Sequence, residues 1–231
     1  MNFSSFFIQK IYRIGFLLLL ILVVFDLLAF FHLPNTLFSE IFSATREQTP
    51  LTWLSATSFL FLGLACLSIY YRLREKIWYF LAVIFLFFSM DDATYLHERL
   101  SGALQENSNV LLTFPSYVWA LLYSPLLAFS FCALLYLLWK KTISESRKPV
   151  IIGLILLSGA FLLDLIDGVT QKNPSIVFCL EQTCHLTTLH LMRLLEEVLE
   201  VLAVGVIGYT LIREHLLLPE SLTHTPEEST L

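Results

Sequence analysis

Acidic side chains and histidines interrupt the long apolar segments of this chain. Asp91 and Asp92 follow directly on a run of Phe, Leu and Ile, and His97 and Glu98 come soon after them in the stretch FFSMDDATYLHERL. A second polar group lies at residues 190–200, HLMRLLEEVLE. Carboxylates and imidazoles serve as general acids and bases and as ligands of divalent metals. These residue types at this spacing therefore point to acid–base or metal chemistry.

Helical spacing would gather these residues on one face of each segment. Neighbouring residues of a helix are about 100° apart, so Asp91 and Glu98 share one side of their segment. The members of the second group fall within an arc of about 120°; they are His190, Arg193, Glu196, Glu197 and Glu200. Asp164 and Asp167 align in the same way in DLIDGVTQ. A narrow acidic stripe on an apolar helix faces a bundle interior or a water-filled cavity rather than lipid.

These stripes predict a metal-dependent site. Imidazole joined to carboxylates suits Zn, Mn or Fe better than Ca or Mg alone. The expected catalytic residues are Arg193, the nearby fixed countercharge, and Glu98 and Asp164, either of which would serve as general base. The metal would activate water to hydrolyse a lipid or a lipid-linked substrate. The candidate metal ligands are Asp91, Asp92, His97, His190, Glu196, Glu197 and Glu200.

Two other functions fit the same residues. In a cation- or proton-coupled transporter, the acids would form an ion site or a proton relay. In a non-catalytic membrane or assembly protein, Arg193 would pair with a glutamate and the other acids would hold the bundle together. Asp26 and Asp167 are further acids in apolar segments. Asp26 is alone in its segment, so a hydrogen bond to a neighbour explains it as well as a functional role does.

The elements that must position these residues are membrane helices. The chain has 231 residues, of which 57% are hydrophobic and 14% charged, whereas a soluble domain is about a quarter charged. Apolar runs near 20 residues recur along its length, which is typical of an all-α, polytopic membrane bundle. The net charge of −5 excludes a generally basic surface for nucleic acid, and membrane lipids are the expected surroundings. We expect six transmembrane helices, at about 13–31, 52–71, 77–100, 116–139, 150–168 and 186–212.

The basic residues predict how the helices are oriented. With six spans, the basic flanks and short loops all fall on one side of the membrane, and the positive-inside rule makes that side cytoplasmic. Both termini are then cytoplasmic, residues 1–215 form the transmembrane domain, and the polar tail 216–231 is expected to be disordered. We expect a multi-pass protein of the bacterial inner (cytoplasmic) membrane. The basic residues are Lys10, Arg13, Arg72, Arg74, Lys76, Lys140, Lys141, Arg147, Lys148 and Arg213.

The acids share one depth range in this arrangement. At about 1.5 Å per residue from its cytoplasmic end, Asp91 lies about 21 Å up an apolar core about 30 Å thick. The same count places the other acids in the outer half, so we expect an outward-facing site. Arg193 and Arg99 are too few to neutralise them, and the rest must be protonated, hydrated or bound to cations. The acids of this range are Asp26, Asp91, Asp92, Glu98, Asp164, Asp167, Glu196, Glu197 and Glu200.

Two cysteines lie in or beside the expected outer loop 169–185. Cys179 and Cys184 would face an oxidising compartment, where a disulfide between them can persist. Together with His185 they could instead form a zinc site, although this spacing is a weak signal for one. We expect the disulfide.

The pieces MDDATYLHERL, FLLDLIDG and LLEEVLEVLAVGVIGY together resemble an uncharacterised family of bacterial multi-pass membrane proteins. The resemblance covers the four expected helices from 77 to 212 and implies that these acids act as a set, but it implies no particular activity. Ceramidase- and adiponectin-receptor-type membrane hydrolases place acid and His ligands on helices in a similar way. They need a His-x-x-x-His pair, and His185 and His190 are five apart. The Glu-x-x-His of di-iron bundles is absent too.

Overall fold

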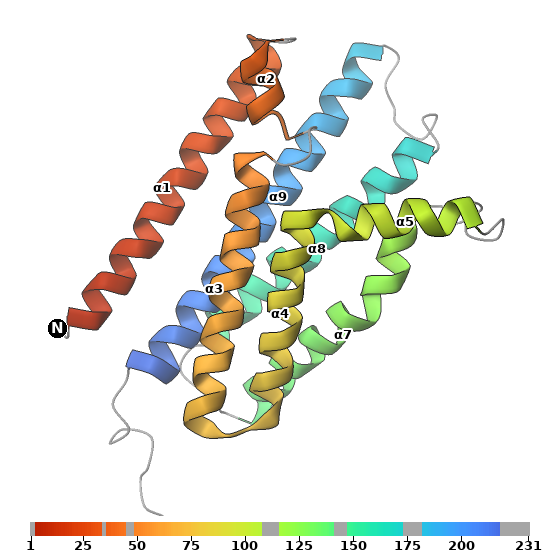
Figure 1. Cartoon of the computed structure of the whole chain (residues 1–231). Coiled ribbons are helices and arrows are strands. Elements are labelled where there is room, and N and C mark those ends of the chain that lie inside the picture. The colour runs from red at the N-terminus through yellow and green to blue at the C-terminus, as the bar shows by residue number, and fades with distance from the viewer. Residues whose placement is uncertain are drawn as a thin grey trace, which may run out of the picture.

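All regular elements of the described residues are helices, as expected from the sequence. The structure, a computed structural model, describes residues 3–33, 36–44, 49–107, 116–140, 147–172 and 182–217. A short π-helical turn, η2 (Arg213–Leu217), follows the last α-helix. The α-helices are α1 (Phe3–Phe31), α2 (Leu37–Phe42), α3 (Pro50–Leu73), α4 (Lys76–Thr94), α5 (Leu96–Asn107), α7 (Val118–Trp139), α8 (Arg147–Lys172) and α9 (Gln182–Ile212) (Figure 1).

The described residues include five helices long and apolar enough to cross a membrane. They are Ile8–Phe31, Pro50–Leu73, Lys76–Thr94, Val118–Leu137 and Arg147–Thr170. Helix α9 has the length of a span at 31 residues, but Arg193 and three glutamates interrupt its apolar sequence. The chain therefore has the helices of a multi-pass membrane protein.

The long helices run alternately up and down the bundle (Figure 1). Helices α3 and α4 form one antiparallel hairpin and α8 and α9 another, while α1 lies at the edge of the bundle and α7 crosses obliquely (Figure 1). The ring of Tyr12, near the start of α1, contacts that of Tyr209, near the end of α9, with centroids 5.1 Å apart. The beginning of α1 and the end of α9 therefore lie at the same end of the bundle.

Local sequence explains where the α3–α4 hairpin begins and turns. The hydroxyl of Thr49 accepts from the backbone N–H of Thr52, and Pro50 occupies the first turn of α3, where its missing N–H costs nothing. Arg74 ends α3 in the left-handed conformation, with φ of 60°, and its N–H donates to the carbonyl of Tyr70. The next helix then begins at Lys76.

The expected helix 77–100 is divided in the structure. Helix α4 ends at Thr94, Tyr95 adopts the left-handed conformation with φ of 53°, and α5 then runs across the bundle at a steep angle to α4 (Figure 1). The cause is local: the carboxylate of Asp91 accepts the backbone N–H of His97 at 2.9 Å, which satisfies a donor that the break leaves without a helical partner. Asp91 therefore builds the turn as well as facing the interior.

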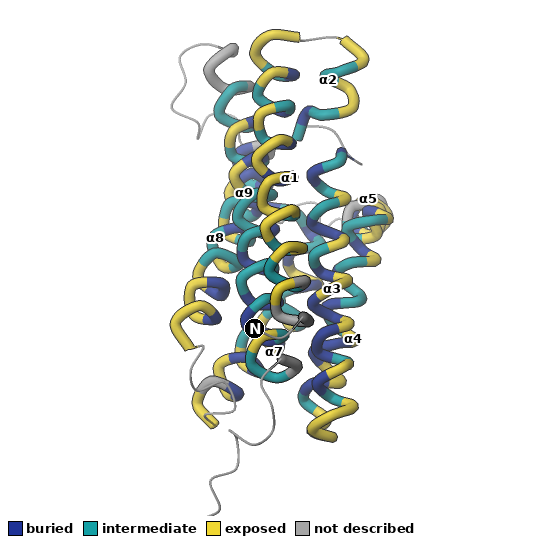
Figure 2. Tube along the Cα trace, turned by 90° about the vertical axis from the view of Figure 1, so that its left-hand side faces the viewer, coloured by how far each residue is buried: buried dark blue, intermediate teal, exposed yellow. Residues whose placement is uncertain are grey.

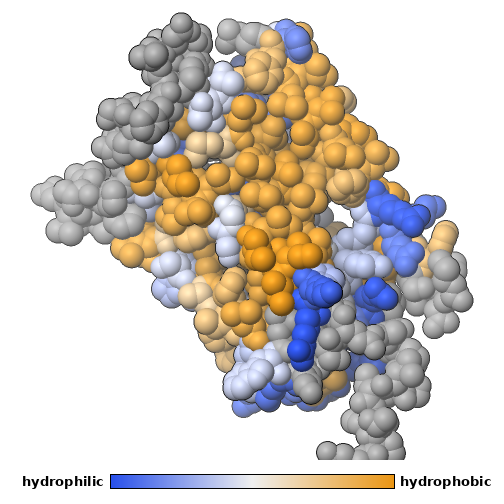
Figure 3. Space-filling view, turned by 180° about the vertical axis from the view of Figure 1, so that it is seen from behind, coloured by the Kyte–Doolittle hydropathy of each residue, from blue (hydrophilic) through white to orange (hydrophobic). Residues whose placement is uncertain are grey.

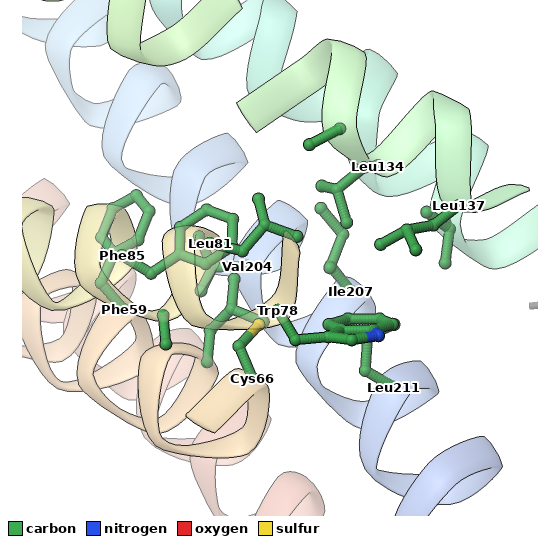
Figure 4. Close-up of a cluster of buried hydrophobic side chains, with 14 of the residues drawn as sticks. Phe59, Cys66, Trp78, Leu81, Phe85, Leu134, Leu137, Val204, Ile207 and Leu211 are labelled. Carbon is green, nitrogen blue, oxygen red and sulfur yellow. The ribbon is translucent and has the colours of Figure 1, made fainter. Parts of the chain in front are cut away.

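A tightly packed apolar core fills the end of the bundle at the α3–α4 turn. Trp78, Leu137, Ile207 and Leu211 come from α4, α7 and α9, and none is more than 2% exposed (Figure 4). The outer faces of the helices are exposed (yellow in Figure 2), and much of the surface seen in Figure 3 is apolar (orange). Ile155, for example, is 64% exposed, which suits a face that contacts lipid.

Candidate functional site

Asp91 is the centre of a hydrogen-bonded group at the α4–α5 turn. Its Oδ2 accepts from Nδ1 of His97 at 2.6 Å, and its Oδ1 accepts from the hydroxyl of Tyr123 on α7 at 2.7 Å. With the backbone N–H of His97, three donors converge on a carboxylate that is only 4% exposed. This arrangement fixes the position of the His97 ring and ties α4, α5 and α7 together.

The His97 ring lines a cavity of about 80 Å³ inside the bundle. Its acidic wall carries Asp91, Asp164, Glu196 and Glu200, which come from α4, α8 and α9. Its aromatic wall carries Phe59, Phe88, Trp119, Tyr123 and Phe161. The site is thus a small cavity, larger than the about 10–15 Å³ that one water needs, and both carboxylates and aromatic rings line it.

Asp164 lies at this cavity without satisfying all of its hydrogen-bonding capacity. Its side chain is 9% exposed, and no described residue gives its Oδ2 a hydrogen bond. Since a buried polar atom is normally paired, this unpaired oxygen on a residue of the cavity lining is a candidate acceptor for a bound ligand or water.

Arg193 is paired outside the cavity lining. Its Nε donates to Oδ2 of Asp167 at 3.2 Å, and the hydroxyl of Tyr117 donates to the same oxygen at 2.8 Å. Gly168 lets the chain before α7 approach closely here, because a Cβ at this position would overlap the hydroxyl of Ser116 and lie 2.7–2.9 Å from Tyr117. Arg193, the countercharge expected from the sequence, therefore pairs with Asp167 and does not line the cavity.

A second group of carboxyls lies between α3 and α9. The Oγ of Ser55 is 3.0 Å from Oδ2 of Asp92 and 2.8 Å from Oε2 of Glu200. The hydroxyl of Thr52 donates to Oε1 of Glu197 at 3.3 Å. Glu200 therefore belongs to both the cavity wall and this group, whereas Asp92 and Glu197 contact α3 and are not part of the cavity lining.

His190 forms a separate, fully buried pair with Asp26 of α1. Its Nε2 donates to Oδ2 of Asp26 at 2.8 Å, its ring stacks on Phe30 at 3.9 Å, and both members of the pair are 0% exposed. The other oxygen of Asp26 accepts from the backbone N–H of Ala44 at 2.5 Å. The pair joins α1, α9 and the segment after α2. Asp26 therefore has a hydrogen-bonded neighbour, which is one of the two explanations expected for it from the sequence.

The structure divides the expected metal set among these groups. Four of the seven candidates line the cavity, namely Asp91, His97, Glu196 and Glu200; Asp92 and Glu197 contact α3, and His190 pairs with Asp26. Within the described ranges, no three His, Cys, Asp or Glu side chains converge tightly enough to hold a metal ion as they stand. The two histidines that favoured Zn, Mn or Fe thus do not share a site.

Four of the predicted site residues fall wholly or partly outside the described part of the chain. The side chains of Glu98, Cys184 and His185 and the whole of Cys179 lie outside the described residues. The predicted disulfide and its zinc alternative are therefore untested, and so is Glu98 as a general base.

Sequence reasoning missed the neutral residues that bond to the acids or line the cavity beside them. Ser55, Trp119 and Tyr123 are single polar or aromatic residues in apolar helices, and nothing in their spacing distinguishes them from packing residues. A usable signal was present only for Tyr123, because a tyrosine in mid-helix needs a partner for its hydroxyl when buried.

Comparison with known proteins places the chain in one family. The model of a domain of unknown function (DUF8692) matches residues 14–213, which include all the elements that build the cavity. No curated protein and no solved structure matches the chain. Because the match covers most of its length, this chain belongs to the DUF8692 family.

Proposed function

We propose that this multi-pass membrane protein binds a cation in the cavity between α4, α5, α8 and α9. The observation that carries the proposal is the cavity's charge: four carboxyls line it, and none of the described residues in the lining is Lys or Arg. An ionised acid inside a membrane costs about 2.5–3.5 kcal/mol on insertion scales, and a bound cation removes much of that cost.

The proposed ligands are the five Asp, Glu and His residues of the lining: Asp91, His97, Asp164, Glu196 and Glu200. Asp164 supports this set most directly, because its unpaired Oδ2 can accept a bond from a ligand without breaking another contact. A divalent Zn, Mn or Fe ion remains one candidate, provided that Glu196 and Glu200 change rotamer to converge on it. A cationic ligand with N–H or N–CH₃ groups is the other candidate.

The proposed topology has six spans with both termini in the cytoplasm of a bacterium and the cavity in the outer half of its inner membrane. The contact between Tyr12 and Tyr209 supports an even number of spans. Arg72, Arg74 and Lys76 lie at the α3–α4 turn, the end of the bundle filled by the apolar core, which fits a cytoplasmic side. This core also supports a one-sided site over a path through the membrane.

Cation-dependent stabilisation tests the proposed function. The purified protein in maltoside micelles should unfold at a higher temperature with saturating Mn²⁺, Zn²⁺ or an alkylammonium ion, by mass action on the folded state. Asp164→Asn and Glu196→Gln should remove the shift, whereas Glu197→Gln, on the same helix but not in the cavity lining, should keep it. No shift with any of these cations, or an equal shift in all variants, would contradict cation binding.

One observation favours a second candidate function, hydrolysis of a lipid or lipid-linked substrate. An imidazole oriented by a carboxylate is a recurrent general base, and His97 is held in this way by Asp91. With a lipid extract as substrate, His97→Gln should lower product release, followed by mass spectrometry, by about 100-fold or more. His32→Gln, on the exposed surface, is the control. Equal product release by wild type and His97→Gln would argue against this role.

A further inference from the structure

The aromatic residues of the lining indicate which class of cation the cavity can bind. Five aromatic side chains share the cavity lining with the four carboxyls, including Trp119, Tyr123 and Phe161. Trp119 packs edge-on against both of the others, at 5.8 Å from Tyr123 and 6.4 Å from Phe161. A bare metal ion gains nothing from apolar ring faces, whereas an organic ammonium is attracted by them through cation–π interactions.

The cavity also changes character along the bundle axis. On α8, Leu157 and Asp164 both line it and are seven residues apart, which is about 10 Å along a helix. On α7, which runs the opposite way, Trp119 precedes Leu127. Asp164 and Trp119 therefore lie toward the α4–α5 turn, and Leu127 and Leu157 lie toward the middle of the bundle. Along α7 and α8, the lining therefore passes from Trp119 and Asp164 to the two leucines.

We propose that the cavity binds the headgroup of an amphiphilic amine, with its ammonium between the carboxyls and the aromatic rings and its alkyl chain leading toward the middle of the membrane. This rests on the proposed cation-binding function and names its ligand class. Asp164, a lining residue that is 9% exposed and whose Oδ2 has no hydrogen-bond partner among the described residues, supplies the acceptor for the ammonium. Leu127 and Leu157 contact the first methylenes.

The volume of the cavity limits how much of the ligand it encloses. At about 80 Å³ it is well below the about 300–1,000 Å³ of pockets that enclose whole drug-sized molecules. It therefore holds the ammonium group and the beginning of the chain, and the rest of the chain lies among apolar side chains or lipid. Amphiphilic amines of different chain length should therefore need the same kind of headgroup in order to bind.

Calorimetric titration of the full chain in maltoside micelles tests this proposal. The probes are decyltrimethylammonium, the neutral amphiphile decanol and Mn²⁺. We expect saturable binding of decyltrimethylammonium at one site per chain and no saturable binding of decanol. Phe161→Leu, which removes a ring face but keeps an apolar side chain, should weaken binding of the ammonium by about tenfold. Asp164→Asn should weaken it at least as much.

Matched variants separate the cavity from the rest of the surface. Phe129→Leu replaces a phenylalanine that is 45% exposed on α7, and Glu40→Gln replaces an exposed acid beyond α1, so both should bind as wild type does. Wild-type ammonium affinity in Phe161→Leu would overturn the assignment of the aromatic wall. Binding of Mn²⁺ without binding of decyltrimethylammonium would overturn the ligand class but leave the proposed function standing. Binding of neither, together with no binding of Zn²⁺, would overturn both.

Discussion

Ser55 of α3 brings together two carboxyls from different helices, Asp92 of α4 and Glu200 of α9. Its hydroxyl lies within hydrogen-bonding distance of a carboxyl oxygen of Asp92 and of Glu200, yet a hydroxyl has one proton to donate. Full hydrogen bonds to both require that one of the two carboxyls be protonated and donate to Oγ. A proton shared by the two carboxyls, directly beside the cavity wall, would satisfy both contacts.

The first prediction concerns this proton. The infrared spectrum of the purified protein at neutral pH should contain the carbonyl stretch of a protonated carboxylic acid. Part of this band should disappear in both Asp92→Asn and Glu200→Gln, because the remaining acid can then ionise and accept from Ser55. Glu40→Gln, which removes an exposed acid, is the control. Spectra of both variants identical to that of wild type would rule out the shared proton.

A second residue-scale prediction concerns His215, which follows the last helix. Burial, and then repulsion by Arg72, lowers the pKa of His215 to about 4. The unfolded chain takes up this proton near the ordinary pKa of about 6.5, so between these values the unfolded state binds more protons than the folded state. The stabilising contribution is complete above about pH 6.5 and is lost as the pH falls toward 4.

Unfolding measurements from pH 4 to 7 test this sign. The free energy of unfolding of wild type should fall as the medium is acidified, and His215→Gln should reduce the slope in this range. His32→Gln, which replaces an exposed histidine, should keep the wild-type slope. A wild-type slope in His215→Gln would show that other groups cause the dependence.

At the scale of elements, the α4–α5 turn and the α7–α8 contact together position the cavity. Tyr95 turns the chain so that His97 comes back over Asp91, and Gly168 lets the chain before α7 lie against α8. Trp119 and Tyr123 follow on α7 and form the aromatic wall. The α4–α5 turn depends on Tyr95, and the α7–α8 contact depends on Gly168. Substitution of either residue should therefore disturb the cavity.

Gly168→Ala should therefore destabilise the protein. The added Cβ would lie 2.9 Å from the backbone nitrogen of Tyr117, and overpacking of this kind costs about 1–3 kcal/mol. Gly205→Ala on α9 is the matched control, because no atom lies within 4 Å of its added Cβ. Denaturation in mixed micelles measures both. Equal stabilities of the two variants would mean that α7 does not approach α8 here.

The elements also show how far the sequence can predict this structure. Hydropathy and length predicted the long helices, and the periodicity of α9 placed its acids on one side, because both depend on residues close in the chain. The break at Tyr95 escaped prediction because a carboxylate from the preceding turn takes the N–H of His97. The division of the candidate metal ligands also escaped it, because their partners Ser55, Tyr123 and Asp26 come from other helices.

At the scale of the whole molecule, polar groups and apolar core occupy different parts of the bundle. The cavity and the two His–Asp pairs lie toward the end where α5 crosses, and the densest apolar packing lies around Trp78 and Leu211 at the other end. A transport path would need polar groups through that second region. A chamber that takes its ligand from one side fits the distribution better.

The most direct test of the central claim is a measurement of cation stoichiometry on the purified full chain. We predict one cation, Mn²⁺ or decyltrimethylammonium, bound per wild-type chain in equilibrium dialysis. We predict none in the double variant Asp164→Asn, Glu196→Gln, and wild-type binding in Glu197→Gln. Retention of one cation per chain by the double variant, or no bound cation in wild type, would contradict the account of the carboxyl-lined cavity as a cation site.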